Sequence, residues 1–241
     1  MASAGSRLWT ALARHEADGP LPLLLLVLTL TTGVLDAVSL LGLGRIFVAN
    51  MTGNVLIVGF AIAGAPGFSL AASVAALVGF LLAVFVGRRH VERWYGHRGR
   101  LLRNATAIEF GLLLVAVLVV IVRPGAADTP SAVAVAAVLA VAMGLQNTTV
   151  RRLGVPDLTT TVITMTMVGI VADRGRTGRV SAARRILAVA MLLVGAIAGA
   201  LLMLHAGIVP ALAVATALLG IVFLIAAVRS RRIATWQLGK S

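Results

Sequence analysis

Six long apolar stretches constrain the fold of this 241-residue chain more than any other feature. Because a helix rises about 1.5 Å per residue, roughly 20 apolar residues cross the hydrocarbon core of a membrane. The stretches are Leu21–Leu43, Leu70–Val86, Ala105–Val122, Ser131–Val150, Ile186–Leu204 and Ile208–Val228. With 60% hydrophobic and 12% charged residues, the chain lies far from the composition of soluble domains. The sequence predicts an all-α integral membrane protein, with the lipid bilayer as a partner.

Two further apolar stretches contain clusters of polar residues. Ile46–Ala63 is interrupted around Asn50 and Asn54, and Leu158–Ala172 contains five threonines. Basic residues decide whether these stretches cross, because cytoplasmic loops collect Lys and Arg. Eight crossing stretches would place 12 of the 21 basic residues inside, whereas six spans with two re-entrant stretches place 19 there. The sequence therefore predicts six transmembrane helices, two re-entrant or broken polar segments and two cytoplasmic termini, with eight spans as the alternative.

An internal repeat divides the chain into two membrane halves. Leu43 and Gly44 recur as Leu153 and Gly154 at an offset of 110 residues, and Asp36 aligns with Asn147 after a one-residue shift. The six-span topology gives the halves opposite orientations, as in transporters with inverted repeats. The expected organisation is an N-terminal tail, a first half, a second half and a basic C-terminal tail, over residues 1–20, 21–122, 131–228 and 229–241.

Asp36 is the most costly polar residue within a predicted span. A carboxylate at the centre of a membrane helix costs about 2.5–3.5 kcal/mol on insertion scales. One interpretation is a proton or cation site, with Ser39 one turn away as a hydrogen-bond partner. The other is a carboxyl group that bonds to a neighbouring helix or amide and holds the two halves together.

The polar pairs Asn50/Asn54 and Thr160/Thr164 are each spaced by four residues, so each pair lines one face if its segment is helical. They line a solute path, or they join packed helices by hydrogen bonds. The complete candidate path consists of Asp36, Ser39, Asn50, Thr52, Asn54, Gln146, Asn147, Thr160 and Thr164.

Other charged and small residues have simpler interpretations. Arg151 and Arg152 are candidate contacts for an anion, but the favoured interpretation is that they are interfacial arginines that follow the charge rule. Glu109 is expected to pair with Arg103 or to extend towards the membrane surface. Gly195 and Gly199 allow close helix packing, either within the chain or in a homo-oligomer.

Several functional classes are excluded by what the sequence lacks. It contains no cysteine, phosphate-binding loop, GxSxG elbow or HExxH motif. We therefore expect no catalytic residues, no metal site, no cofactor and no enzymatic activity. The basic residues are distributed between apolar segments instead of forming one patch, so nucleic acid is not an expected partner.

Two segments carry a resemblance to a known family. GVLDAVSLLGLGRIFVANMTGN, from Gly33 to Asn54, and AMGLQNTTVRRLGVPDLTTTVITMT, from Ala142 to Thr166, resemble the YoaK-like family of uncharacterised bacterial multi-pass membrane proteins. The resemblance implies a bacterial cytoplasmic (inner) membrane location and a six-span topology. It implies no substrate.

The function that these features favour is a transporter or channel-like permease for an unknown small solute. The main alternative is a membrane component without transport activity, with an assembly or sensory role. A third hypothesis is an intramembrane enzyme that uses Asp36 and Glu109, although the sequence contains no recognisable nucleophile, base or metal set.

Overall fold

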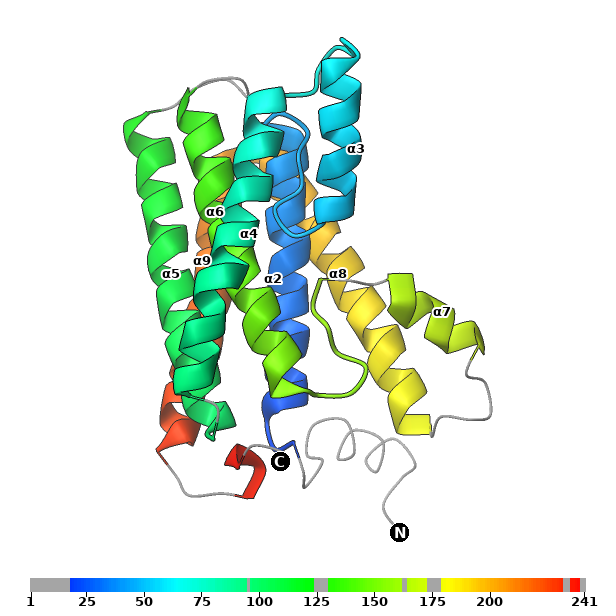
Figure 1. The fold of residues 1–241 in the computed structure, drawn as a ribbon, viewed down its shortest axis with the longest axis vertical. Coiled ribbons are helices and arrows are strands. Elements are labelled where there is room, and N and C mark those ends of the chain that lie inside the picture. Colours follow the sequence, from blue (N-terminus) through cyan, green and yellow to red (C-terminus); the bar gives the residue numbers. More distant parts are fainter. Residues whose placement is uncertain are drawn as a thin grey trace.

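The computed structural model describes residues 18–94, 96–123, 130–161, 164–172, 179–231 and 235–238. Within these ranges, six helices are long and apolar enough to cross a membrane, which confirms the predicted number of spans. They form one elongated bundle (Figure 1). Their bounds are α2 Leu21–Gly42, α4 Leu70–Arg93, α5 Arg98–Val122, α6 Pro130–Leu153, α8 Arg179–His205 and α9 Ile208–Ser230.

Several helices are longer than the apolar stretches that predicted them. Helix α4 continues past Val86 to Arg93, and α5 begins at Arg98, before the expected start at Ala105. Hydropathy marks the part of a helix that lies in hydrocarbon, whereas backbone hydrogen bonding continues into the polar interface. Arginines tolerate this position because their stems lie along apolar surface while their charged groups reach water.

Side chains cap three of the helices. The side chains of Asn50, Ser69 and His97 each accept a backbone N–H three residues later, which fixes the starts of α3, α4 and α5. His97 needs a neutral Nδ1 to accept the N–H of Arg100. Burial and the nearby charge of Arg100 lower the pKa of His97, which favours this neutral form.

The two polar stretches form short helices, α3 (Met51–Ile62) and α7 (Thr164–Ala172). With 12 and 9 residues they cover only about 18 and 14 Å, less than the hydrocarbon thickness. After α2 the chain turns back into the bundle, and α3 then runs towards the end of the bundle at which α2 finished (Figure 1). After α6 the chain likewise turns back into the bundle before α7 (Figure 1). The broken segments are confirmed, and these lengths do not fit an eight-span topology.

Helices α2 and α6 are the most buried of the six spans. Helix α2 packs against α8, α6 packs against α4, and α5 packs against α9. Helices α5 and α9 also contact α6 and α2, respectively. Apolar side chains such as Leu82 and Phe85 remain exposed on the outside of α4. These exposed apolar side chains are stable in a membrane, because lipid hydrocarbon surrounds them in place of water.

Glycines set the closest helix crossings. A Cβ atom at Gly33 of α2 would lie 2.3 Å from the carbonyl oxygen of Leu192 in α8, and one at Gly195 would lie 2.1 Å from that of Leu30. At the other crossing, a Cβ at Gly144 of α6 would lie 2.6 Å from the carbonyl oxygen of Phe80 in α4. Gly195 and Gly199 therefore serve packing within the chain, one of the two uses expected for them.

Basic residues collect at one end of the bundle. We call the end where α2 begins and α9 ends the basic end (Figure 1). Helices α4 and α6 end there and α5 and α8 begin there, so most of the described arginines lie at this end. Among the described basic residues, only Arg45 and Arg123 belong to connections at the opposite end.

The topology can be tested with single cysteines at Ala63, after α3, and at Gly96, between α4 and α5. We expect a membrane-impermeant maleimide to label Ala63→Cys but not Gly96→Cys on intact cells, because the positively charged end faces the cytoplasm. Gly96→Cys should react after the cells are permeabilised. Labelling of Gly96→Cys from outside together with a cytoplasmic reporter near Arg179 would instead support eight spans, whereas external signals at both would mean an inverted six-span bundle.

The helix crossing can be tested with Gly195→Ala. The added methyl group meets backbone, so we expect a loss of about 1–3 kcal/mol and a lower Tm in detergent. Gly111→Ala is the matched control, because no atom lies within 4 Å of the added carbon. Equal Tm values for the two variants would contradict the close crossing.

Candidate functional site

The first broken segment places its backbone next to Asp36. Residues 43–50, which we call the first connection, lead from α2 to α3. The backbone N–H groups of Val48 and Ala49 interact with the Asp36 carboxyl group. Asp36 lies about 9 Å inside the end of α2, at six residues of 1.5 Å each. Its Oδ1 atom is buried and accepts no hydrogen bond from a described residue. The carboxyl group therefore retains acceptor capacity inside the bundle.

Ser39 does not bond to that carboxyl group. Its hydroxyl donates to the backbone carbonyl of Asp36 at 3.1 Å, and the side chain is fully buried. The expected partner of the carboxyl group is thus replaced by backbone amides of the first connection. A hydroxyl bond to the carbonyl three residues earlier is a common local arrangement in helices.

Asn54 holds the bend of the first connection. Its Nδ2 donates to the carbonyl of Phe47 at 2.6 Å, and its Oδ1 accepts the N–H of Phe47 at 2.8 Å. Asn50 instead caps α3, and Thr52 is exposed on that helix. The expected shared face of Asn50 and Asn54 is therefore wrong, because Asn50 precedes the first helical turn.

The second broken segment meets Gln146 at a buried point between α2 and α6. Residues 154–161, the second connection, follow α6. Gln146 Nε2 donates to the hydroxyls of Thr32 at 3.2 Å and Thr160 at 3.1 Å. Thr160 has φ +60°, which is strained for a β-branched residue. Gln146 Oε1 is buried and has no hydrogen-bond partner in the described ranges.

Asn147 lies beside this point and also binds the second connection. The Thr161 hydroxyl donates to Asn147 Oδ1 at 2.6 Å. Asn147 and Asp36 therefore have similar surroundings, because each meets the connection that follows its own helix. Thr164 begins α7 and is exposed, so Thr160 and Thr164 do not share one helical face as expected. Thr160 belongs to the second connection, which is not helical, so a spacing of four residues does not place it on the same face as Thr164.

A cavity of about 760 Å³ opens beside the second connection, between α4 and α6. The polar side chains of Asn147, Thr148 and Thr159 line it, together with Arg88 and Arg151. The other lining residues are Phe80, Leu81, Val84, Val150, Gly154, Val155 and Leu158. This volume is in the range of small-molecule binding sites.

The two candidate anion contacts differ in position. Arg151 is exposed and borders the cavity, whereas Arg152 is half-buried and is not among the lining residues. Arg151 forms no hydrogen bond or ion pair with another described residue. Of the two, Arg151 is the one that is placed to contact an anion in the cavity.

The expectation for Glu109 is wrong. Its side chain is 1% exposed, and its Oε2 atom is buried without a hydrogen-bond partner among the residues described. Arg103 instead donates to Asn104 at 2.9 Å. Glu109 lies about 16 Å into α5, at 1.5 Å per residue from Arg98. The apolar stretch begins at Ala105, which suggested that Glu109 lies near the start of its helix. Because α5 begins at Arg98, Glu109 lies deeper in the bundle than hydropathy predicted.

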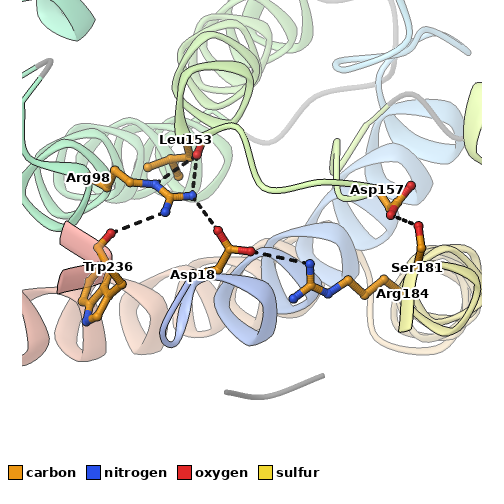
Figure 2. A network of polar contacts seen from close by, with 7 residues as sticks. All are labelled: Asp18, Arg98, Leu153, Asp157, Ser181, Arg184 and Trp236. Carbon is orange, nitrogen blue, oxygen red and sulfur yellow. Dashed lines mark hydrogen bonds and ion pairs between the residues drawn. The ribbon is translucent and has the colours of Figure 1, made fainter. Parts of the chain in front are cut away.

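A buried network that the sequence did not reveal connects the helices at the basic end. Asp18 Oδ1 lies 3.0 Å from Arg98 Nη2, and Asp18 Oδ2 lies 3.6 Å from Arg184 Nη1. Arg98 also donates to the carbonyls of Leu153 and Trp236 (Figure 2). The network therefore links the N-terminal segment, α5, α6, α8 and the short helix η1 (Thr235–Gln237).

The second connection is anchored beside this network. Asp157 Oδ1 lies 2.7 Å from Arg185 Nε. Asp157 Oδ2 accepts the hydroxyl of Ser181, a contact that Figure 2 shows. Both side chains of this pair are 12% exposed, so it is less shielded from solvent than the pairs of Asp18. The middle of the second connection is thus fixed to α8, while its last residues, Thr160 and Thr161, bond to Gln146 and Asn147.

Chemically, the arrangement offers acceptors and hydroxyls inside an apolar bundle, with cations near one opening. Asp36 can hold a proton or a cation, and the amides and hydroxyls around Gln146 can exchange hydrogen bonds with a solute. Arg88 and Arg151 supply positive charge at the cavity.

Comparison with known proteins matches residues 24–225 to a family described as "Protein of unknown function (DUF1275)". The chain is 31% identical over 155 residues to the "UPF0700 transmembrane protein YoaK" of Bacillus subtilis (strain 168). The alignment covers 62% of this chain and 65% of that relative. No solved structure matches the chain.

Accessibility of the cavity can be tested in a chain that has no native cysteine. We expect a small membrane-permeant thiol reagent to label Asn147→Cys and Thr159→Cys in folded protein, because both positions line the cavity. Ser73→Cys is the control, since Ser73 is fully buried in α4. Protection of both cavity positions to the level of Ser73→Cys would contradict an open cavity.

Proposed function

We propose a transport function for this chain, which belongs to the DUF1275 family of proteins of unknown function. The proposed protein is a transporter or channel-like permease for a small solute in the bacterial cytoplasmic membrane. One observation carries the proposal: polar connections enter the bundle from opposite ends and stop beside two buried acceptors, Asp36 Oδ1 and Gln146 Oε1, that have no hydrogen-bond partner in the part of the chain that the structure describes. Unpaired polar atoms are costly in a membrane unless water or a solute reaches them.

An inverted repeat of the two halves is part of the proposal. It is supported by the helix pairing, since the contact of α2 with α8 corresponds to that of α6 with α4. Gly33 and Gly144, which align in the two halves, both lie at close crossings. Helix α2 runs away from the basic end and α6 runs towards it, so the halves have opposite directions (Figure 1). Such halves commonly place a binding site near the middle of the membrane.

The proposed path includes the cavity and the two inner contact points. From the cytoplasmic, basic end, a solute enters the cavity and reaches Asn147 and Thr159. It then meets the hydrogen-bonded group of Gln146, Thr160 and Thr32. Asp36 and the first connection act from the opposite side. In this proposal, shifts of either connection open or close its end, because its inner contacts are a few side-chain hydrogen bonds, made by Asn54 in the first connection and by Gln146 and Asn147 in the second. The proposal includes no catalytic step.

A role without transport has one observation in its favour. The buried hydroxyls of Thr29 and Thr32 donate to backbone carbonyls of their own helix, and Asn54 satisfies Phe47 within the first connection. Polar residues of this kind serve as internal structure. They are compatible with an assembly or sensory component whose interior never admits a solute.

Asp36→Asn tests the transport function. We expect the variant to remain folded, because the aligned position already holds Asn147. We expect it to move solute at least about tenfold more slowly, a barrier increase of about 1.4 kcal/mol, or to lose its pH dependence. The measurement is stopped-flow light scattering of proteoliposomes challenged with glycerol, urea, formate or acetate, with a luminal pH dye to follow protons.

Ser73→Ala is the control for this experiment, because Ser73 is a buried polar residue of α4 that lies outside the proposed path. Rates equal to those of protein-free vesicles for every solute would favour the non-transport role. An Asp36→Asn protein that keeps the rate and pH profile of the natural protein would contradict a role for this carboxyl group.

A further inference from the structure

The cavity beside the second connection has largely apolar walls, which do not suit a purely polar solute. Apolar side chains of α4, including Phe80 and Val84, form one side, and Val155 and Leu158 of the second connection also line it. Burying a polar molecule against such walls removes water without replacing its hydrogen bonds. An apolar part of a ligand, in contrast, gains by the contact.

The cavity also reaches the lipid-facing side of the bundle. Leu81 lines the cavity and is 60% exposed, and its neighbours Leu82 and Phe85 are exposed on the outside of α4. Because exposed apolar side chains of a membrane helix face hydrocarbon, the cavity is accessible from the bilayer as well as from its polar end. A ligand with an apolar chain can therefore enter sideways.

Two arginines give the cavity a positive charge. Arg151 has no hydrogen bond or ion pair with another described residue. Arg88 contacts Glu92 at 3.1 Å, but both side chains are largely exposed, so that pair holds Arg88 only weakly. Both guanidinium groups are thus available to an oxyanion, with which arginine forms paired hydrogen bonds.

We propose that this cavity binds a single-chain anionic amphiphile, whose carboxylate or phosphate group contacts Arg151 and Arg88 and whose apolar chain lies along Phe80, Val84 and Leu158. The cavity of about 760 Å³ has the size of a site for one small molecule. The inference deepens the proposed function and rests on it, because it names the class of solute that enters from the basic end. Asn147 and Thr159 then hydrogen-bond to the polar group.

The test uses dodecanoate with a terminal diazirine as a photoreactive probe, and the protein in phosphatidylcholine nanodiscs. Mass spectrometry of the adducts should find them concentrated in residues 80–88 and 154–159. Dodecyl phosphate should compete, whereas dodecanol should not, because only the phosphate can pair with arginine. Arg151→Gln should reduce labelling about tenfold, the loss expected for a charge-assisted hydrogen bond. Arg151→Lys, which keeps the charge, should lose less.

Arg89→Gln is the matched control, since Arg89 is also exposed on α4 but does not line the cavity. Its labelling should equal that of the natural protein. Labelling spread evenly over all lipid-facing helices, or unchanged by Arg151→Gln, would overturn the proposal. If phosphatidylglycerol in the nanodisc abolishes labelling while dodecyl phosphate does not compete, the cavity holds a membrane lipid, and the proposal is also overturned.

This experiment separates the inference from the proposed function, because adduct formation needs no transport. Amphiphile labelling without any solute flux would support the binding site and remove the transport function. Flux of small polar solutes without labelling would support transport and overturn the amphiphile as its substrate.

Discussion

Backbone groups that leave a helix inside lipid must find hydrogen-bond partners within the protein. The first connection of this bundle meets that requirement directly. Asn54 satisfies both backbone groups of Phe47, and the Asp36 carboxyl group meets the amides of Val48 and Ala49. The second connection is held differently, because Gln146 and Asn147 bond to the side-chain hydroxyls of Thr160 and Thr161. The polar residues of α2 and α6 thus have a structural task before any functional one.

This double use bears on how the site can work. Asp36 and Gln146 each also keep a buried acceptor that has no hydrogen-bond partner among the described residues, so both retain bonding capacity beyond their structural contacts. The middle of the second connection is fixed to α8 by the pair of Asp157 and Arg185, and its last residues, Thr160 and Thr161, bond to Gln146 and Asn147. Because uncharged hydrogen bonds cost less to break than a charged pair, movement of these last residues is the less costly change.

The buried network at the basic end provides the stable frame for such movement. Arg98 alone contacts the N-terminal segment, the end of α6 and the C-terminal helix η1. Glycine crossings of α2 with α8 and of α6 with α4 bring the helix backbones into close contact. The cavity lies along the α4–α6 pair. One of its walls is the second connection, which is held against α6 by uncharged side-chain hydrogen bonds.

The sequence by itself determined the number of spans, their approximate positions and the two broken segments, because hydrophobic length and arginine placement act locally along the chain. It also identified Asp36, Gln146 and Asn147, since a polar residue in an apolar stretch is visible without a structure. It could not decide that Asn50 caps a helix, that Glu109 is buried or that Asp18 lies between Arg98 and Arg184. Asp18 and Arg98 are 80 positions apart in the sequence, so only tertiary packing could show that they form an ion pair. The cavity likewise arises where α4, α6 and the second connection meet, and no single segment encodes it.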